Sequence, residues 1–183
     1  MGIINNFMKK NKIYRSFALI VIFFLAGFLL INQSSKNLKL QNNPENIKYV
    51  QIAGQSIKVD LALTSLEQTQ GLSGRNELKE GEGMLFVFEH LDNYTFWMKD
   101  MNFPIDIIWL APSEGGDASK AKVIYIKKDA RPESYPETYG PPNVPTPVGI
   151  STSVGAKYVL EVVSGFLDKN NLKVGDGVEF IYR

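Results

Sequence analysis

The sequence predicts a small α+β fold that is predominantly β, with a curled, barrel-like antiparallel sheet and one or two short helices. Three observations support this prediction. Seven or eight short runs rich in β-branched and aromatic residues are separated by glycine, proline and asparagine. The body of the chain carries helix start or stop signals at two short stretches only. The 183 residues are 44% hydrophobic and 21% charged, which is the composition of a globular protein.

The N-terminus has the pattern of a membrane anchor. Residues 1–12 carry lysines and are expected to stay in the cytoplasm, residues 13–31 are long and apolar enough to span a bilayer, and residues 32–46 form a polar tether. No small-residue cleavage site follows the apolar run, so an uncleaved signal-anchor is favoured over a secreted or periplasmic protein released by cleavage. The folded domain, residues 47–183, is then expected outside the cytoplasm.

Local signals predict the first elements of the body. A hairpin is expected to turn at Ala53-Gly54. Thr64 and Glu67, three residues apart, form a capping box that starts a short helix, and Gly71 ends it. A hairpin insertion separates the last two of three strand-like runs, which lie at residues 83–88, 103–110 and 121–128.

The later part of the chain contains a segment of unusual composition. Residues 131–153 include six prolines and two tyrosines, and proline is excluded from central strands. We interpret this segment as a semi-rigid flap, with disorder as the alternative. Residues 157–163 are the next strand, Ser164 is expected to cap a short helix, and a strand closes the chain.

Several motifs carry a resemblance to a known family. The motifs are GLSGR (71–75), GMLFVF (83–88), FWMKDMNFPIDIIWL (96–110) and the late pair KYVLEVVSG and LKVGDGVEF. In this combination the chain resembles the domain of unknown function 192 family of bacteria and archaea, from about Ile57 to Phe180. The resemblance implies a compact, mostly β domain that often follows a signal or anchor segment. It implies no activity.

A charged pair, Lys99-Asp100, interrupts the apolar stretch that holds both tryptophans. It is interpreted either as a solvated turn between two strands or as part of a polar cluster with Arg75, Asp106 and Glu161. Asp106 and Glu161 each stand inside an apolar run, where a buried carboxylate needs a partner. We expect Arg75 to bind one of these acids, and its removal to cost about 3–5 kcal/mol.

Two chemical functions are compatible with these residues. The carboxylates of the polar cluster suit an envelope hydrolase that divides acid and base roles between two acids. A copper(I) protein is the other alternative, because thioethers and imidazole suit that ion. Its candidate ligands are Met84, His90, Met98 and Met101. The competing interpretation places the methionines in the core, where methionine commonly fills gaps.

The function that we favour is a binding or accessory module of the cell envelope, rather than an enzyme. Trp97, Tyr135 and Tyr139 are amphipathic aromatic residues of the kind that stack on sugar rings or anchor peptides, whereas Trp109 is expected in the core. A glycan, a peptide or a partner protein is the expected ligand, and no cofactor is expected. Six basic and no acidic residues precede Glu45, which leaves 14 basic against 19 acidic residues in the body. This acidic body gives no electrostatic reason to bind nucleic acid.

Overall fold

The computed structural model describes residues 21–30, 43–142 and 155–182. The chain divides into two compact units, residues 1–41 and residues 42–183. In the first unit, residues 21–30 form a helix whose side chains are mostly exposed. Within the described residues, no helix has the length and apolar character needed to cross a membrane. The remainder of the span predicted for residues 13–31, and residues 32–42 of the tether, lie outside the described residues.

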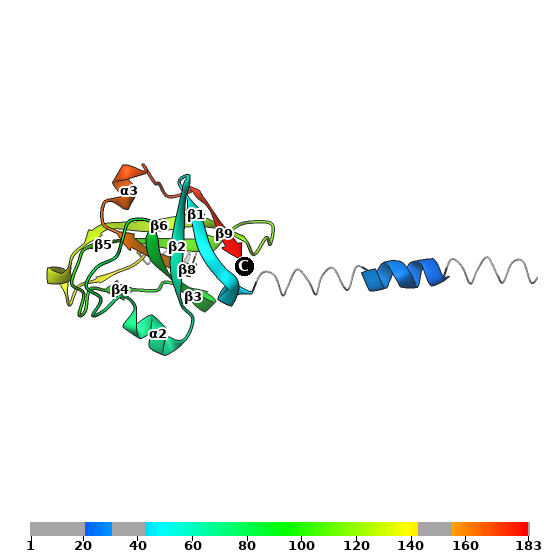
Figure 1. Ribbon diagram of the computed structural model, residues 1–183, viewed down its shortest axis with the longest axis horizontal. Coiled ribbons are helices and arrows are strands. Elements are labelled where there is room, and N and C mark those ends of the chain that lie inside the picture. The colour runs from blue at the N-terminus through cyan, green and yellow to red at the C-terminus, as the bar shows by residue number, and fades with distance from the viewer. Residues whose placement is uncertain (1–20, 31–42, 143–154, 183) are drawn as a thin grey trace, which may run out of the picture. The chain divides into compact units, whose positions relative to one another are not determined.

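The second unit is built on a closed barrel of seven strands (Figure 1). In barrel order the strands are β1 (Ile47–Ile52), β2 (Gln55–Ala62), β3 (Glu82–Asp92), β8 (Ala156–Val163), β5 (Ile105–Pro112), β6 (Lys120–Ala130) and β9 (Gly177–Tyr182). The predicted barrel-like, predominantly β fold is therefore confirmed.

One pair of strands departs from the expected antiparallel sheet. β2 and β3 run parallel, with Val59 opposite Gly83 and Leu61 opposite Leu85. Parallel neighbours need a crossover connection, and residues 63–81 provide one that contains the helix α2 (Ser65–Gln70). The sequence did not predict this parallel pair, because a crossover of this kind is not encoded by either strand alone.

Smaller elements surround the barrel. α2 and the short helix α3 (Phe166–Lys169) lie on opposite sides of it (Figure 1). β4 (Phe96–Trp97) and β7 (Thr138–Tyr139) pair as a separate two-stranded sheet. Two 3-10 turns, η1 (Pro44–Asn46) and η2 (Pro132–Ser134), complete the described elements. The proline-rich segment therefore contributes no strand to the barrel in its described part, residues 131–142, whereas residues 143–153 lie outside the described residues.

Local signals placed most turns and caps correctly. The β1–β2 hairpin turns through Ala53 and Gly54, both with positive φ. The capping box is complete, since Thr64 accepts from the Glu67 amide and the Glu67 carboxylate accepts from the Thr64 amide. α2 ends at Gly71, whose φ of 51° is strained for a residue with a Cβ.

The cap predicted for the second helix was wrong. The Ser164 hydroxyl donates a hydrogen bond to Asp129 and caps no helix amide. The Asp106 carboxylate, from β5, instead accepts from the amide of Leu167 at 2.8 Å. Asp106, which is distant in the chain, thus accepts the hydrogen bond at the helix N-terminus that was expected from the neighbouring Ser164.

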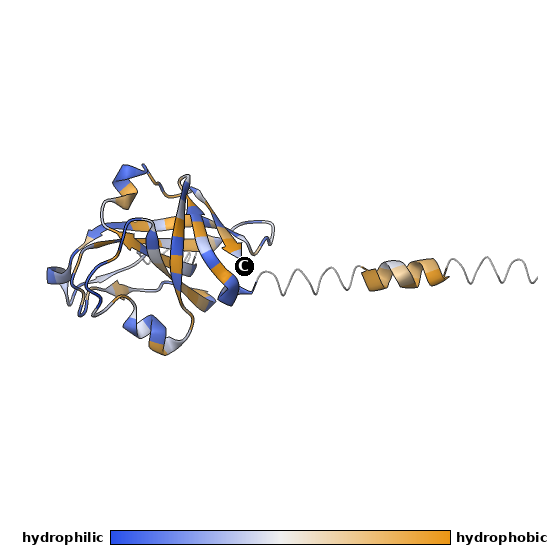
Figure 2. Cartoon of the chain, in the orientation of Figure 1, coloured by the Kyte–Doolittle hydropathy of each residue, from blue (hydrophilic) through white to orange (hydrophobic). Residues whose placement is uncertain are grey.

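Two hydrophobic clusters cover the two faces of the sheet. The inner cluster fills the barrel with residues from all seven strands, such as Leu85, Ile108 and Leu160. The outer cluster lies on the other face of β3, β5 and β8 and includes Phe86, Trp109 and other residues. Apolar and polar bands alternate along β1 and β2, which have one covered face (Figure 2). β5 and β8 are buried almost throughout, because clusters lie on both of their faces.

Candidate functional site

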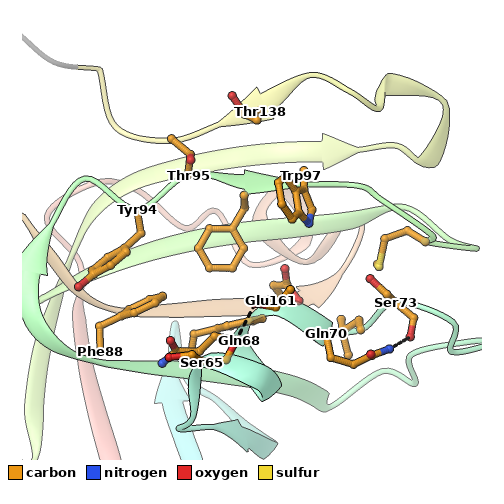
Figure 3. Close-up of a pocket in the computed structure, with 16 residues that line it drawn as sticks. Ser65, Gln68, Gln70, Ser73, Phe88, Tyr94, Thr95, Trp97, Thr138 and Glu161 are labelled. Carbon is orange, nitrogen blue, oxygen red and sulfur yellow. Dashed lines mark hydrogen bonds between the residues drawn. The ribbon is translucent and has the colours of Figure 1, made fainter.

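A pocket of about 330 Å³ opens above the outer face of the sheet. Three parts of the chain enclose it: α2 with the turn that follows, the segment that contains β4, and the outer faces of β3 and β8 (Figure 3). We call it the aromatic pocket. The residues that line it are Ser65, Gln68, Thr69, Gln70, Gly71, Leu72, Ser73, Phe86, Phe88, Tyr94, Thr95, Phe96, Trp97, Met101, Thr138 and Glu161.

Aromatic rings form the walls of the pocket. Phe88 and Tyr94 stack with centroids 3.5 Å apart and ring planes 10° apart, and Phe96 meets Phe86 edge to face. The indole N–H of Trp109 donates to the backbone oxygen of Tyr94 at 2.7 Å. This bond ties the wall that contains Tyr94 to the core, and it also satisfies the one polar atom of a fully buried side chain.

Polar side chains line the opposite wall and the rim. Gln68 donates from its amide nitrogen to the backbone oxygen of Val87 at 2.9 Å, and Gln70 donates to that of Ser73 at 3.0 Å. Each glutamine amide is therefore oriented, and its carbonyl oxygen keeps acceptor capacity. Thr138 contributes from β7, on the far side of the pocket (Figure 3).

Glu161 lies at the floor of the pocket in surroundings that do not suit a charge. It stands on β8 directly between Met84 of β3 and Ile107 of β5, and it is 5% exposed. Its Oε2 atom is buried and has no hydrogen-bond partner among the described residues. Burial raises the pKa of Glu161 to about 8, although the positive charge of Arg75 acts to lower it. The carboxyl group is therefore mostly neutral at pH 7.

A second hollow of about 360 Å³ adjoins the aromatic pocket and shares Trp97 with it. Lys99 and Asp100 line this side hollow, together with the exposed Leu66. Lys99 and Asp100 form a turn between β4 and β5, and Asp100 has a φ of 55°. The solvated-turn interpretation of this pair is correct, and the turn lies beside the pocket.

The structure separates the two buried acids that the sequence suggested as one cluster. Asp106 is opposite Val162 in the β5–β8 pair, whereas Glu161 is opposite Ile107. Their side chains therefore leave the sheet on opposite faces. Asp106 accepts two backbone hydrogen bonds, from Asp129 at 2.9 Å and from Leu167 at 2.8 Å, so its environment is structural. These two carboxyl groups do not form an acid–base pair.

The prediction that Arg75 binds Asp106 or Glu161 was also wrong. Its guanidinium donates to the Asp60 carboxylate at 2.8 Å, and the two side chains are 39% and 59% exposed. Arg75 follows α2 after a tight turn, which directs it towards β2, the strand that α2 follows in the chain. Glu161 experiences the charge of Arg75 but forms no ion pair with it.

The two tyrosines of the proline-rich segment have different environments. Tyr135 is 48% exposed and lies outside the lining of the pocket. Tyr139, expected to be accessible, is only 9% exposed because it packs in the outer cluster, and the Lys127 ammonium lies 4.3 Å from its ring centroid. Trp97 is 48% exposed and lines the pocket, while Trp109 is fully buried.

The candidate copper ligands lie in unlike surroundings. Met84, Met98 and Met101 are buried together in the outer cluster, and Met101 also lines the aromatic pocket. The side chain of His90 is 87% exposed on β3, not in a turn as expected. Over the described part of the chain, no group of three or more histidine, cysteine and acidic residues has the geometry of a metal site.

Several lining residues had no signal in the sequence. Gln68, Gln70 and Ser73 belong to α2 and its turn, where polar residues are ordinarily interpreted as solvent-facing. They line a pocket because the crossover lays α2 along the sheet, which is a tertiary relationship. The stacking of Phe88 on Tyr94 likewise depends on the fold and had no signal in the sequence.

Comparisons with known proteins place the body of the chain among uncharacterised proteins. Residues 48–180 match the domain of unknown function 192 family, described as an uncharacterised ACR. A protein of unknown function from Novosphingobium aromaticivorans DSM 12444 is 29% identical, with a TM-score of 0.59, and the match covers 73% of this chain and 84% of that one. A Sinorhizobium meliloti 1021 protein, described as a "putative transcription regulator", is 25% identical with a TM-score of 0.55, and the match covers 69% and 83%. No match was found among curated proteins.

Proposed function

This chain belongs to the domain of unknown function 192 family, whose description supplies no activity, and we propose from the pocket itself that the protein is a binding module for a cell-envelope glycan. The ligand group is a single sugar residue held in the aromatic pocket. Trp97 is the observation that carries the proposal. It is a large aromatic residue, half exposed, at the edge of a pocket whose other walls are aromatic and polar.

The chemistry of the pocket fits a sugar ring. Aromatic faces stack against the C–H groups of a sugar, while a few oriented polar groups fix its hydroxyls. The volume of about 330 Å³ is at the lower end of the usual range for small-molecule sites, roughly 300–1,000 Å³. The carbonyl oxygens of Gln68 and Gln70 offer acceptors, and Thr138 offers a hydroxyl on the opposite side.

Two exposed aromatic residues give a matched test. The full chain is purified in a detergent without a sugar headgroup, and its retention on insoluble peptidoglycan is measured. Trp97→Ala should abolish retention, because stacking at the rim is lost. Tyr135→Ala removes an aromatic side chain that is equally exposed, at 48%, but lies outside the pocket lining, and should leave retention unchanged. Equal retention of both variants and the parent would refute the role of the pocket.

The location proposed for this module is the outer face of the cell membrane. Lysines precede an apolar run in residues 13–31, which supports an anchor with the body outside the cytoplasm. Protease added to intact spheroplasts should digest the body of the full-length protein and spare the first residues. A shorter mature form that begins after Ile31 would instead indicate a cleaved signal peptide.

A further inference from the structure

The buried carboxyl group of Glu161 has no structural role that explains its position. Asp106, the other buried acid, binds two backbone amides, whereas Glu161 Oε2 has no partner among the described residues. Its side chain points into the aromatic pocket between Trp97 and α2 (Figure 3). A buried polar group without a partner lowers the stability of a fold, and a ligand that pairs with the group recovers that loss. The geometry therefore indicates a group that completes its hydrogen bonding when the pocket is filled.

We propose that Glu161, as a neutral acid, donates its O–H to the carbonyl oxygen of an acetamido group, so that the pocket selects N-acetylated amino sugars. This inference rests on the proposed function and specifies its ligand. The donor lies on an apolar floor, next to Met84 and Ile107 in the sheet. Leu72, Phe86 and Met101 also line the pocket. Such a lining suits the methyl group that accompanies an acetamido carbonyl, whereas a hydroxyl brings no apolar group to this floor.

The charges around the pocket favour a neutral ligand over a cation. Glu161 is the one carboxyl group among the residues that line the pocket, and Arg75 is the charged group that acts on it. Arg75 lies outside the pocket lining and pairs with Asp60, but its positive charge still acts at Glu161 and disfavours a cation there. Tyr94 is the other titratable lining residue, and burial raises its pKa above its ordinary value of 10, so it stays neutral. Because burial raises the pKa of Glu161 to about 8, its carboxyl group keeps the O–H between pH 5 and pH 7 and can donate it.

Two disaccharides that differ at the acetamido position test the selection. Isothermal titration of the full chain, in a detergent without a sugar headgroup, compares N,N′-diacetylchitobiose with cellobiose at pH 6.5. The acetamido sugar should bind at least about tenfold more tightly, as expected when a buried donor finds its acceptor. Above pH 8, its affinity should fall as Glu161 loses the proton.

Substitutions at Glu161 distinguish binding through a hydrogen bond that Glu161 donates from binding through the negative charge of its carboxylate. Glu161→Gln keeps an N–H donor, so binding should persist and lose its dependence on pH. Glu161→Leu should weaken binding of diacetylchitobiose by about tenfold or more. Titration with the deacetylated, cationic chitobiose tests whether the site instead binds an ammonium group. If it binds more tightly than the acetylated form and Glu161→Gln abolishes that binding, the carboxylate recognises an ammonium and the proposal is overturned.

The remaining outcomes distinguish the inference from the function on which it rests. Equal affinities for diacetylchitobiose and cellobiose, both lost in Trp97→Ala, would refute the role of Glu161 and leave the glycan-binding module standing. Absence of binding by either sugar at millimolar concentration, together with no retention on peptidoglycan, would overturn both. The pH profile of the parent protein gives a result even where a variant fails to fold.

Discussion

Asp106 and Glu161 occupy adjoining positions of the paired strands β5 and β8, yet their side chains leave the sheet on opposite faces. Asp106 reaches the end of the barrel beside α3, where two backbone amides bind it. Glu161 reaches the floor of the aromatic pocket, where no described residue binds its Oε2 atom. Both acids are buried, but one is satisfied within the fold and the other is not. Their substitution should therefore affect stability in different ways.

Replacement of Asp106 should destabilise the protein strongly. Asp106→Ala leaves the amides of Asp129 and Leu167 without an acceptor, and each unsatisfied buried group costs about 1–3 kcal/mol. Asp106→Asn keeps one oxygen acceptor and should cost roughly half as much. Urea denaturation measures both. Asp176→Ala is the matched control, because this partly exposed carboxylate also accepts a backbone amide, that of Lys173, and its loss should cost under about 1 kcal/mol.

Replacement of Glu161 should change how stability depends on pH. The folded-state pKa of about 8 exceeds the ordinary value of 4.5, so the folded protein retains a proton that the unfolded chain releases. The stability of the parent relative to Glu161→Gln should therefore fall between about pH 5 and pH 8, by about 1.4 kcal/mol per pH unit at most, and level off above. Urea midpoints at several pH values measure this difference. A difference that stays constant with pH would show that Glu161 titrates normally.

The positions of these two acids also show what the sequence could and could not predict. Each acid stood visibly inside an apolar run, so their burial was predictable. Their relative orientation depends on the register that sets Asp106 opposite Val162. A slip of one residue would put both carboxylates on the same face. Strand register is a non-local property, and the sequence suggested a single polar cluster that the register divides.

Local features were predicted better because their partners are close in the chain. The turn at Ala53-Gly54 and the capping box of Thr64 and Glu67 depend on residues within three positions of one another. The parallel β2–β3 pair and the position of α2 over the sheet depend on the crossover between them. The aromatic pocket is formed by that crossover and by the β4–β7 pair, so its polar wall had no signature in the sequence.

Removal of Arg75 should have a small effect on stability and a measurable effect on Glu161. The pair of Arg75 with Asp60 is partly exposed, and such pairs contribute about 0–1 kcal/mol, well below the 3–5 kcal/mol of a broken buried pair. Arg75→Ala removes a positive charge that lowers the pKa of Glu161, so that pKa should rise. Carbon-13 NMR titration of the Glu161 carboxyl group measures the change.

Two further variants serve as controls for the effect of Arg75→Ala on the pKa of Glu161. Arg75→Lys keeps the positive charge and should leave the pKa of Glu161 close to that of the parent. Arg131→Ala removes a cation that pairs with Asp129 and does not act on Glu161, so it should not move that pKa. A stability loss above about 3 kcal/mol in Arg75→Ala would instead indicate the buried ion pair that the sequence suggested.

Substitution of the two tryptophans should affect stability to different extents, because Trp109 is buried and Trp97 is half exposed. Trp109→Phe removes the donor to the Tyr94 backbone oxygen and part of a fully buried ring. We expect a loss of about 2–4 kcal/mol from the cavity and the unsatisfied oxygen together. Since this bond holds the wall that continues to Trp97, hydrogen exchange should become faster at residues 94–97. Trp97→Phe, in a half-exposed position, should change stability by no more than about 0.5 kcal/mol. If Trp109→Phe leaves both stability and exchange unchanged, the indole N–H does not hold the pocket wall in place.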